Sequence, residues 1–108
     1  MNTQHRIEIS VLNDCYGVLL TSHQTEMIRL YYDLDVSLSE IAEQYSVSRQ
    51  AVRDAIMRGE RALEEYENSL HIVAKTRRVV EGLESLKADT SDSVHEKIDG
   101  LIDIMEGD

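Results

Sequence analysis

The amino-acid sequence predicts an all-α fold, and three observations support that prediction. The 108 residues include no proline, tryptophan or phenylalanine, and only five glycines. Apolar residues recur at spacings of three and four, which gathers them on one side of a helix. No run of β-branched and aromatic residues bounded by turn residues, the pattern of a strand, is present. A chain of this length fits a single fold that buries roughly two-thirds of its unfolded surface.

Helix starts are marked by short polar motifs. Thr21 with Gln24 forms a capping box, in which the hydroxyl accepts an amide hydrogen bond and the residue three positions on returns one to the cap. Ser37 with Glu40 repeats that motif, and Ser93 with Glu96 is expected to open a last helix. The first helix is expected over residues 5–20, with an apolar face made of Ile9, Leu12, Tyr16, Leu19 and Leu20.

Residues 37–56 predict a helix, a tight turn and a second helix. Ala42 is small where two helices must cross closely, and Ser48 is placed to cap the second helix. The Val47 side chain is expected to be buried on the inside of the turn. Ser46 occupies a position where a glycine often accommodates the turn. Inside the second helix, Ala51, Val52 and Ile56 are expected to face the core.

The start of the second helix carries polar residues suited to nucleic acid. In a helix-turn-helix this part enters the major groove, where Arg binds guanine and Gln reads adenine. Arg58 and Arg61 follow as candidate phosphate contacts. The same hairpin can also serve as a protein-docking unit, and that alternative stays open. The residues expected to face outward are Ser48, Arg49, Gln50, Arg53 and Asp54.

Beyond Arg58 the apolar pattern predicts one long helix with a short coiled-coil-like seam. The seam is either an interface with a second copy or a partner, or the face that packs on the rest of its own domain. Residues 1–72 are expected to form the helix-turn-helix core, and residues 73–108 a helical acidic extension that ends in a short helix. The seam consists of Leu63, Tyr66, Leu70 and Val73.

Charge is distributed unevenly along the chain, whose formal net charge is −10. Residues 79–108 carry nine acids and two lysines, a net charge of −7, whereas residues 1–78 carry twelve acids and nine bases. Within residues 46–61 four arginines face two acids. Because the Debye length is about 8 Å at physiological salt, a local basic surface can act within an acidic chain. The acidic segment is expected to restrain the basic hairpin, to serve another partner, or to aid solubility.

Three segments, YYDLDVSLSEIAE, SVSRQAVRD and ALEEYE, carry a resemblance to a known family. Residues 20–56 resemble the sigma-factor-type helix-turn-helix, and residues 7–87 resemble the YlxM family of small bacterial helix-turn-helix proteins. The resemblance implies a homodimeric regulatory protein of the signal recognition particle pathway. Its implied ligands are DNA or the particle's RNA, and its implied binding residues are Ser48, Arg49, Gln50 and Arg53. The rival interpretation is a module that docks on the particle's GTPase without reading nucleic acid.

The sequence gives little support for catalysis. The four histidines are dispersed, and Cys15 is the only cysteine, so neither a disulfide nor a thiolate zinc site is expected. Asp99 and Asp103 share a helix face but have no oxygen ligands from a second element. We expect no catalytic residue, metal or cofactor. No apolar stretch reaches the length of a membrane helix, and a cytoplasmic location is expected.

Overall fold

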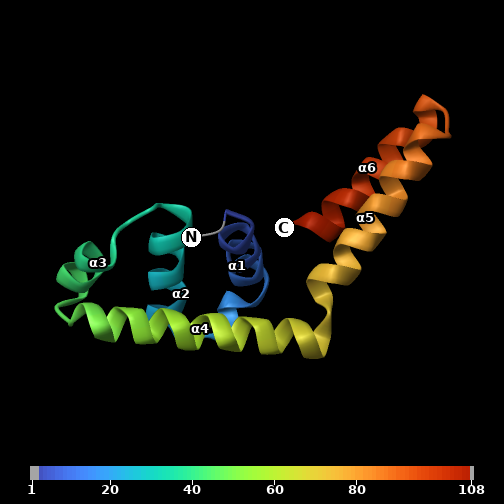
Figure 1. Ribbon diagram of the computed structural model, residues 1–108. Coiled ribbons are helices and arrows are strands. Elements are labelled where there is room, and N and C mark those ends of the chain that lie inside the picture. The colour runs from blue at the N-terminus through green and yellow to red at the C-terminus, as the bar shows by residue number, and fades with distance from the viewer. Residues whose placement is uncertain (1–2, 108) are drawn as a thin grey trace. The chain divides into compact units, whose positions relative to one another are not determined.

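The computed structural model of the protein describes residues 3–107, which consist of helices and turns without a strand (Figure 1). The all-α fold predicted from the sequence is confirmed. The chain divides into two compact units, Met1–Leu70 and His71–Asp108. The sequence interpretation divides it two residues later, after residue 72. Among residues 3–107 no helix combines the length and the apolarity that a membrane span requires.

The first unit is built on one long helix, α4, against which the three helices that precede it pack (Figure 1). The side of α4 that faces them carries Val52, Ile56, Gly59 and Leu63, all buried. In chain order the elements are α1 (Thr3–Tyr16), η1 (Gly17–Leu19), α2 (Ser22–Ile28), the π-helical η2 (Arg29–Asp33), α3 (Leu38–Tyr45) and α4 (Arg49–Leu70).

The caps form largely as the sequence predicts. Thr21 accepts a hydrogen bond from the Gln24 amide at 3.1 Å, and the Gln24 side chain accepts one from the Thr21 amide at 3.3 Å. Ser37 accepts from the Glu40 amide at 3.1 Å, but the Glu40 carboxylate accepts from the Ser37 hydroxyl rather than from its amide. The second capping box is therefore only half formed.

Several residues predicted to be inside lie outside. Leu19 is 53% exposed because the chain leaves α1 at Tyr16 and turns through η1, which carries Leu19 off the buried face. Val47 is 43% exposed, so its side chain is not buried inside the turn. Ala51 is also exposed. The buried positions of this region are Ile41 and Ala42 on α3 and Val52 and Ile56 on α4.

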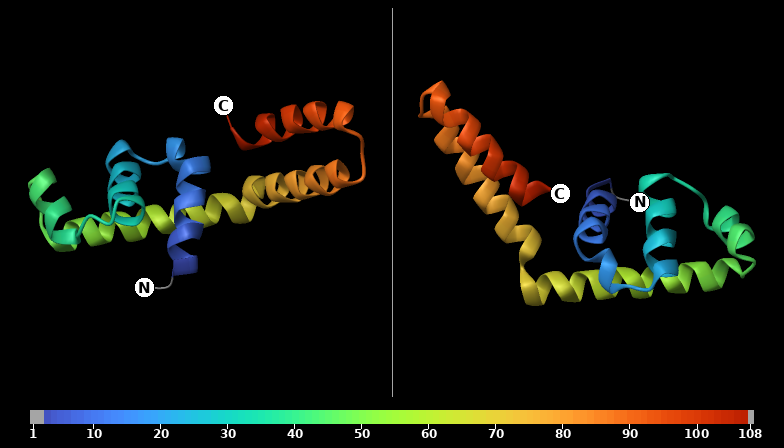
Figure 2. Two further views of the ribbon diagram at one scale, coloured as in Figure 1. Left: turned by 90° about the horizontal axis from the view of Figure 1, so that it is seen from above. Right: turned by 180° about the vertical axis from the view of Figure 1, so that it is seen from behind.

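The second unit is a hairpin of two antiparallel helices, α5 (Ile72–Ala88) and α6 (Asp92–Glu106) (Figure 2). Its buried apolar residues among those described are Val73, Ile98 and Ile102. Ser91, not Ser93, is the N-cap of α6, so the sequence prediction placed this helix start two residues late. The Ser91 and Ser93 hydroxyls hydrogen bond to each other at 2.9 Å.

The single long helix predicted from Arg58 onward is wrong. α4 ends at Leu70, and α5 begins at Ile72, with His71 between them in the left-handed region at φ 57°. A residue in this conformation cannot continue a right-handed helix. The seam that the sequence pattern suggested is therefore divided between two helices.

Ser46 offers a test of the turn between α3 and α4. Its backbone is left-handed, with φ 56°, which costs a serine about 1–2 kcal/mol that glycine avoids. We expect Ser46→Gly to raise the free energy of unfolding by about 0.5–1 kcal/mol, after allowing for the greater freedom of glycine in the unfolded chain. Urea denaturation measures this change. The matched control, Ser39→Gly at an exposed position in the first turn of α3, should instead lower stability by about 0.5 kcal/mol, and equal effects would contradict the prediction.

Candidate nucleic-acid interface

The turn between α3 and α4 fixes where the second helix begins. Ser46 ends α3 in the left-handed conformation, and the Val47 amide donates to the Ala42 carbonyl at 3.0 Å. The Ser48 hydroxyl then accepts a hydrogen bond from the Ala51 amide at 3.0 Å. Ser48 therefore caps α4 as the sequence predicts, and Arg49 is the first residue of the helix.

The polar residues predicted to face outward at the start of α4 are exposed except for Asp54, which is half-buried. Arg49, Gln50 and Arg53 are exposed, and neither arginine has an ion-pair partner among residues 3–107. The Gln50 side chain donates to the Asp54 carboxylate at 2.9 Å, which holds its amide along the helix. With Leu38 of α3, the two arginines and Gln50 line a surface groove of about 360 Å³.

Arg58 and Arg61 lie on the same helix but on a different side. Nine residues separate Arg49 from Arg58, about two and a half turns, so their side chains leave α4 in opposite directions. By the same helical repeat, the Arg61 side chain leaves α4 a little under a quarter turn around the helix axis from the Arg53 side chain. The structure therefore brings Arg49 and Arg53 together and does not bring Arg58 into their groove.

A second hollow of about 390 Å³ adjoins that groove and shares Leu38 and Arg53 with it. It contains a polar cluster that the sequence analysis did not single out. The Tyr32 hydroxyl donates to the Glu60 carboxylate, and His5 Nε2 lies 3.9 Å from the same oxygen. The hollow is lined by His5, Tyr31, Tyr32, Leu38, Arg53, Ile56, Met57 and Glu60.

Burial raises the pKa of Glu60 above its usual 4.5, the adjacent His5 opposes that rise, and Glu64 adds to it. The Glu60 side chain is only 16% exposed, so this acid is turned away from the solvent around the arginines. The two acids within residues 46–61 are Asp54 and Glu60. The Glu60 side chain is therefore directed into the protein. The surface at the start of α4 is more basic than the sequence suggests.

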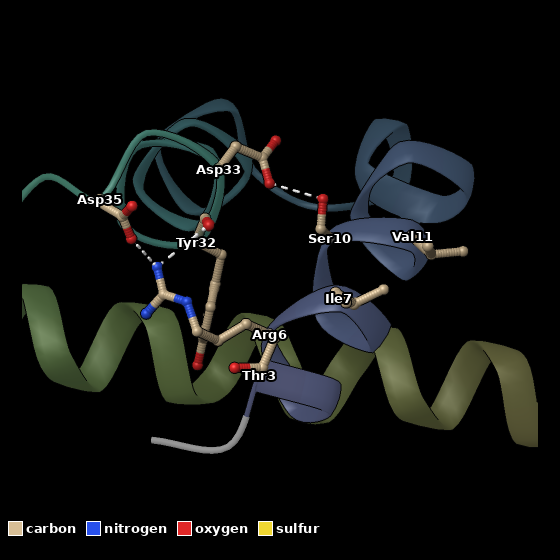
Figure 3. Close-up of a pocket in the computed structure, with 8 residues that line it drawn as sticks. All are labelled: Thr3, Arg6, Ile7, Ser10, Val11, Tyr32, Asp33 and Asp35. Carbon is tan, nitrogen blue, oxygen red and sulfur yellow. Dashed lines mark hydrogen bonds and ion pairs between the residues drawn. The ribbon is translucent and has the colours of Figure 1, made fainter.

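A third hollow, of about 450 Å³, lies between α1 and the end of η2 (Figure 3). The Arg6 guanidinium donates to the carbonyl oxygens of Tyr31 and Tyr32 at 3.0 and 3.2 Å and pairs with Asp35. The Ser10 hydroxyl donates to the Asp33 carboxylate at 2.6 Å. These bonds fasten α1 to the segment before α3, so Arg6 is already engaged within the fold.

The four residues of the predicted seam do not share one surface. Leu63 is fully buried inside the first unit, and Val73 is buried inside the second. Tyr66 is half-buried with its ring 5.9 Å from that of Tyr16, and Leu70 is 46% exposed at the end of α4. For Leu63 and Val73, packing within their own units accounts for the apolar pattern.

The sequence analysis considered Cys15 and Asp99 as possible chemical groups, and the structure gives the surroundings of both. Within residues 3–107, no three His, Cys, Asp or Glu side chains gather in a group that could hold a metal ion. Burial raises the pKa of the Cys15 thiol and Glu67 raises it further, against a hydrogen bond from Tyr16 that lowers it. A thiol with a raised pKa is a poor nucleophile at neutral pH. Lys87 binds Asp99 at 2.8 Å, so Asp99 is held in an ion pair within the hairpin.

Comparison with known proteins places the chain in a family. A family model described as "Putative helix-turn-helix protein, YlxM / p13 like" matches residues 3–102. The chain belongs to this family. It is 43% identical over 107 residues to the UPF0122 protein YlxM of Bacillus subtilis (strain 168), which covers 98% of this chain and 97% of that relative.

Two further relatives agree with this assignment. The UPF0122 protein OB1530 of Oceanobacillus iheyensis is 47% identical over 97 residues, 89% of this chain and 92% of the relative. The UPF0122 protein of Desulforamulus reducens is 54% identical over 68 residues, 63% of this chain and 58% of the relative. The family is described by its helix-turn-helix and not by an enzymatic activity.

The buried carboxyl group beside the groove provides a pH-dependent test. Because the pKa of Glu60 is raised in the folded chain, the folded state binds more protons than the unfolded state from about pH 4.5 up to that raised pKa. Stability therefore falls as the pH rises through this window. Glu60→Gln removes the charge and keeps an oxygen for the Tyr32 hydroxyl. We expect the variant to exceed the parent in free energy of unfolding at pH 7, and this advantage to shrink toward pH 4.

Urea denaturation of both proteins at several pH values measures this difference. The matched control is Glu65→Gln, an exposed acid of α4 that is not among the groups that shift the pKa of Glu60. A Glu60→Gln advantage that does not change with pH would contradict the assignment of the effect to the buried charge.

Proposed function

We propose that the protein binds double-stranded nucleic acid through the first turns of α4 and acts as a regulatory protein of the signal recognition particle pathway. One observation carries the binding proposal. Arg49 and Arg53 lie on one side of α4, exposed and without an acidic partner among the described residues, beside the exposed Gln50. The pathway assignment is supported by the family resemblance alone.

Duplex DNA suits this geometry better than structured RNA does. The DNA major groove is about 12 Å wide and admits a helix of about 10–12 Å diameter. The deep, narrow major groove of RNA does not admit one readily, so an RNA ligand would be held through its backbone and shape. In that case Arg49 and Arg53 would still contribute, whereas Gln50 would contribute little.

The acidity of the chain does not oppose this proposal. Acidic residues are concentrated in residues 79–108, whereas the start of α4 is locally basic. The helix N-terminus adds partial positive charge near Arg49. Arg58 and Arg61 leave α4 on another side, so we assign them phosphate contacts outside the groove that Arg49 and Arg53 occupy.

A second candidate function is a protein-docking module on the particle's GTPase, without nucleic-acid readout. The acidic surface of α6 favours it, because Glu96 and Asp103 are exposed there and the helix carries a net negative charge. For neither candidate do we propose a catalytic role, a metal or a cofactor. Titration of the pure protein against duplex DNA, the particle RNA and the particle GTPase at one salt concentration separates the two.

The arginines give the first binding test. Removing an arginine that neutralises one phosphate of duplex DNA should flatten the slope of log affinity against log salt by about 0.9. We expect Arg49→Ala and Arg53→Ala each to weaken binding and flatten that slope. Fluorescence anisotropy over a salt series measures both effects.

Arg78→Ala is the matched control, because it removes the same charge from an exposed position of the second unit, outside the proposed binding surface. It should change affinity and slope less than the other two variants. If all three variants bind like the parent, or lose affinity equally, the groove at the start of α4 is not the binding surface.

Gln50 distinguishes base reading from backbone binding. We expect Gln50→Ala to reduce discrimination between duplex sequences by about 1–3 kcal/mol while leaving non-specific binding nearly unchanged. Competition between the selected sequence and mixed-sequence DNA measures this loss. Unchanged discrimination, together with weaker binding of Arg49→Ala, would indicate recognition of backbone and shape.

A further inference from the structure

We propose that the nucleic-acid surface extends past Arg53 into the neighbouring hollow, where the protonated side chain of His5 on α1 contacts a phosphate group. Binding of nucleic acid then takes up a proton, so affinity rises as the pH falls. This contact rests on the proposed binding function and adds a binding residue from a second helix. It lies entirely within the first unit.

The hollow is continuous with the groove at the start of α4. Arg53 and Leu38 line both, so a strand that follows the groove past Arg53 reaches the hollow directly. Glu60 lies seven residues after Arg53, about 10 Å further along α4, and leaves the helix on the same flank. The His5 side chain lines the hollow from α1 and is 43% exposed, with its ring 6.2 Å from that of Tyr32.

His5 and Glu60 form a pair within this hollow. Nε2 of His5 lies 3.9 Å from the Glu60 carboxylate oxygen that accepts the hydrogen bond from the Tyr32 hydroxyl. Their titrations are therefore coupled, and one further proton makes the pair less negative by one unit charge, whichever residue holds it. The other titratable or charged groups that line the hollow or act on Glu60 are Tyr31 and Tyr32 of η2 and Arg53 and Glu64 of α4.

A phosphate group favours the form of the pair that holds the additional proton. A phosphate bound by Arg53 brings negative charge to the edge of the hollow, and a nearby negative charge disfavours loss of a proton. Because Glu60 is largely buried, salt screens its charge less than it screens a charge in solvent. Histidine is the side chain that changes charge between pH 5 and 8, so the exchange falls near neutral pH. Linkage then requires that protonation strengthen nucleic-acid binding to the same extent.

The cluster is held in place from the side of α1 and η2. Arg6, next to His5 in the sequence, donates to the carbonyl oxygens of Tyr31 and Tyr32 and pairs with Asp35 (Figure 3). Tyr32 is only 8% exposed, so these contacts fix the hydroxyl that binds Glu60. His5 is therefore the exposed member of an ordered cluster, and its side chain is the one placed to meet a phosphate group.

Packing alone does not call for a carboxylate at position 60. An amide there could accept the same hydrogen bond from Tyr32, and burial raises the pKa of Glu60, which means that its charged form is costly to the fold. Residues that break a local rule in this way are expected at functional sites. The carboxylate gives His5 a partner that favours its protonated form, and it opposes anion binding in the hollow when that proton is absent.

Duplex affinity at pH 6 and pH 8, at one salt concentration, tests the proposal. We expect the parent to bind about three- to tenfold more tightly at pH 6, the effect of one partly screened charge near a phosphate. His5→Gln should lower the affinity at pH 6 to about the parent's value at pH 8. Glu60→Gln should act in the opposite direction and raise the affinity at pH 8 to about the parent's value at pH 6.

The matched control is His95→Gln in the second unit, where Nδ1 of His95 lies 3.5 Å from the Asp92 carboxylate. This variant removes a histidine beside an acid without altering the hollow, so it should keep the pH dependence of the parent. Calorimetry in two buffers of different ionisation enthalpy gives the number of protons taken up on binding. We expect a fraction of a proton for the parent at pH 7 and less for His5→Gln.

The outcomes separate this contact from the proposed function. If the parent binds duplex DNA and Arg49→Ala weakens that binding, but His5→Gln keeps the full pH dependence, the His5 contact is wrong and the proposed function stands. Equal flattening by His95→Gln would assign the pH dependence to overall charge and would likewise overturn the contact. If the parent binds no nucleic acid at either pH, the proposed function fails and the contact fails with it.

Discussion

The first unit depends on burying one narrow apolar stripe of α4. Val52, Ile56, Gly59 and Leu63 fall within about 60° of one another around the helix, and each preceding helix packs against this stripe. Gly59 makes room for Ile28 of α2, because a Cβ atom at position 59 would lie 2.6 Å from Cδ1 of Ile28. The Tyr16 hydroxyl on α1 donates to Glu67 at 2.5 Å, which fixes α1 nearer the far end of α4.

Burial of the stripe also decides which residues are available for binding. Once Val52 and Ile56 face the core, Arg49 and Arg53 must leave α4 along one flank of the stripe. Arg58 must then leave on the far side, because the helical repeat permits no other placement. Glu60, seven residues after Arg53, leaves α4 on the same flank, where its carboxylate accepts a hydrogen bond from the Tyr32 hydroxyl beside His5. The basic groove and the buried acid are two consequences of one packing contact.

Local chemistry made part of this structure predictable. The capping residues Thr21 and Ser48 act through hydrogen bonds within their own turn, and their partners can be identified from spacing alone. Outward placement of Arg49 and Gln50 follows from the helical period. The left-handed Ser46 occupies the position where a glycine often accommodates the turn of such a hairpin.

Other features depend on tertiary contacts or on weak local signals. The break at His71 has no glycine or proline to mark it, and the apolar spacing continues across it, so periodicity alone extends the helix. Ser91 and Ser93 are equally good caps by residue type. The hydrogen bond partner of Glu60 is Tyr32, which lies 28 positions away in the sequence. The two residues meet only because η2 packs within the first unit.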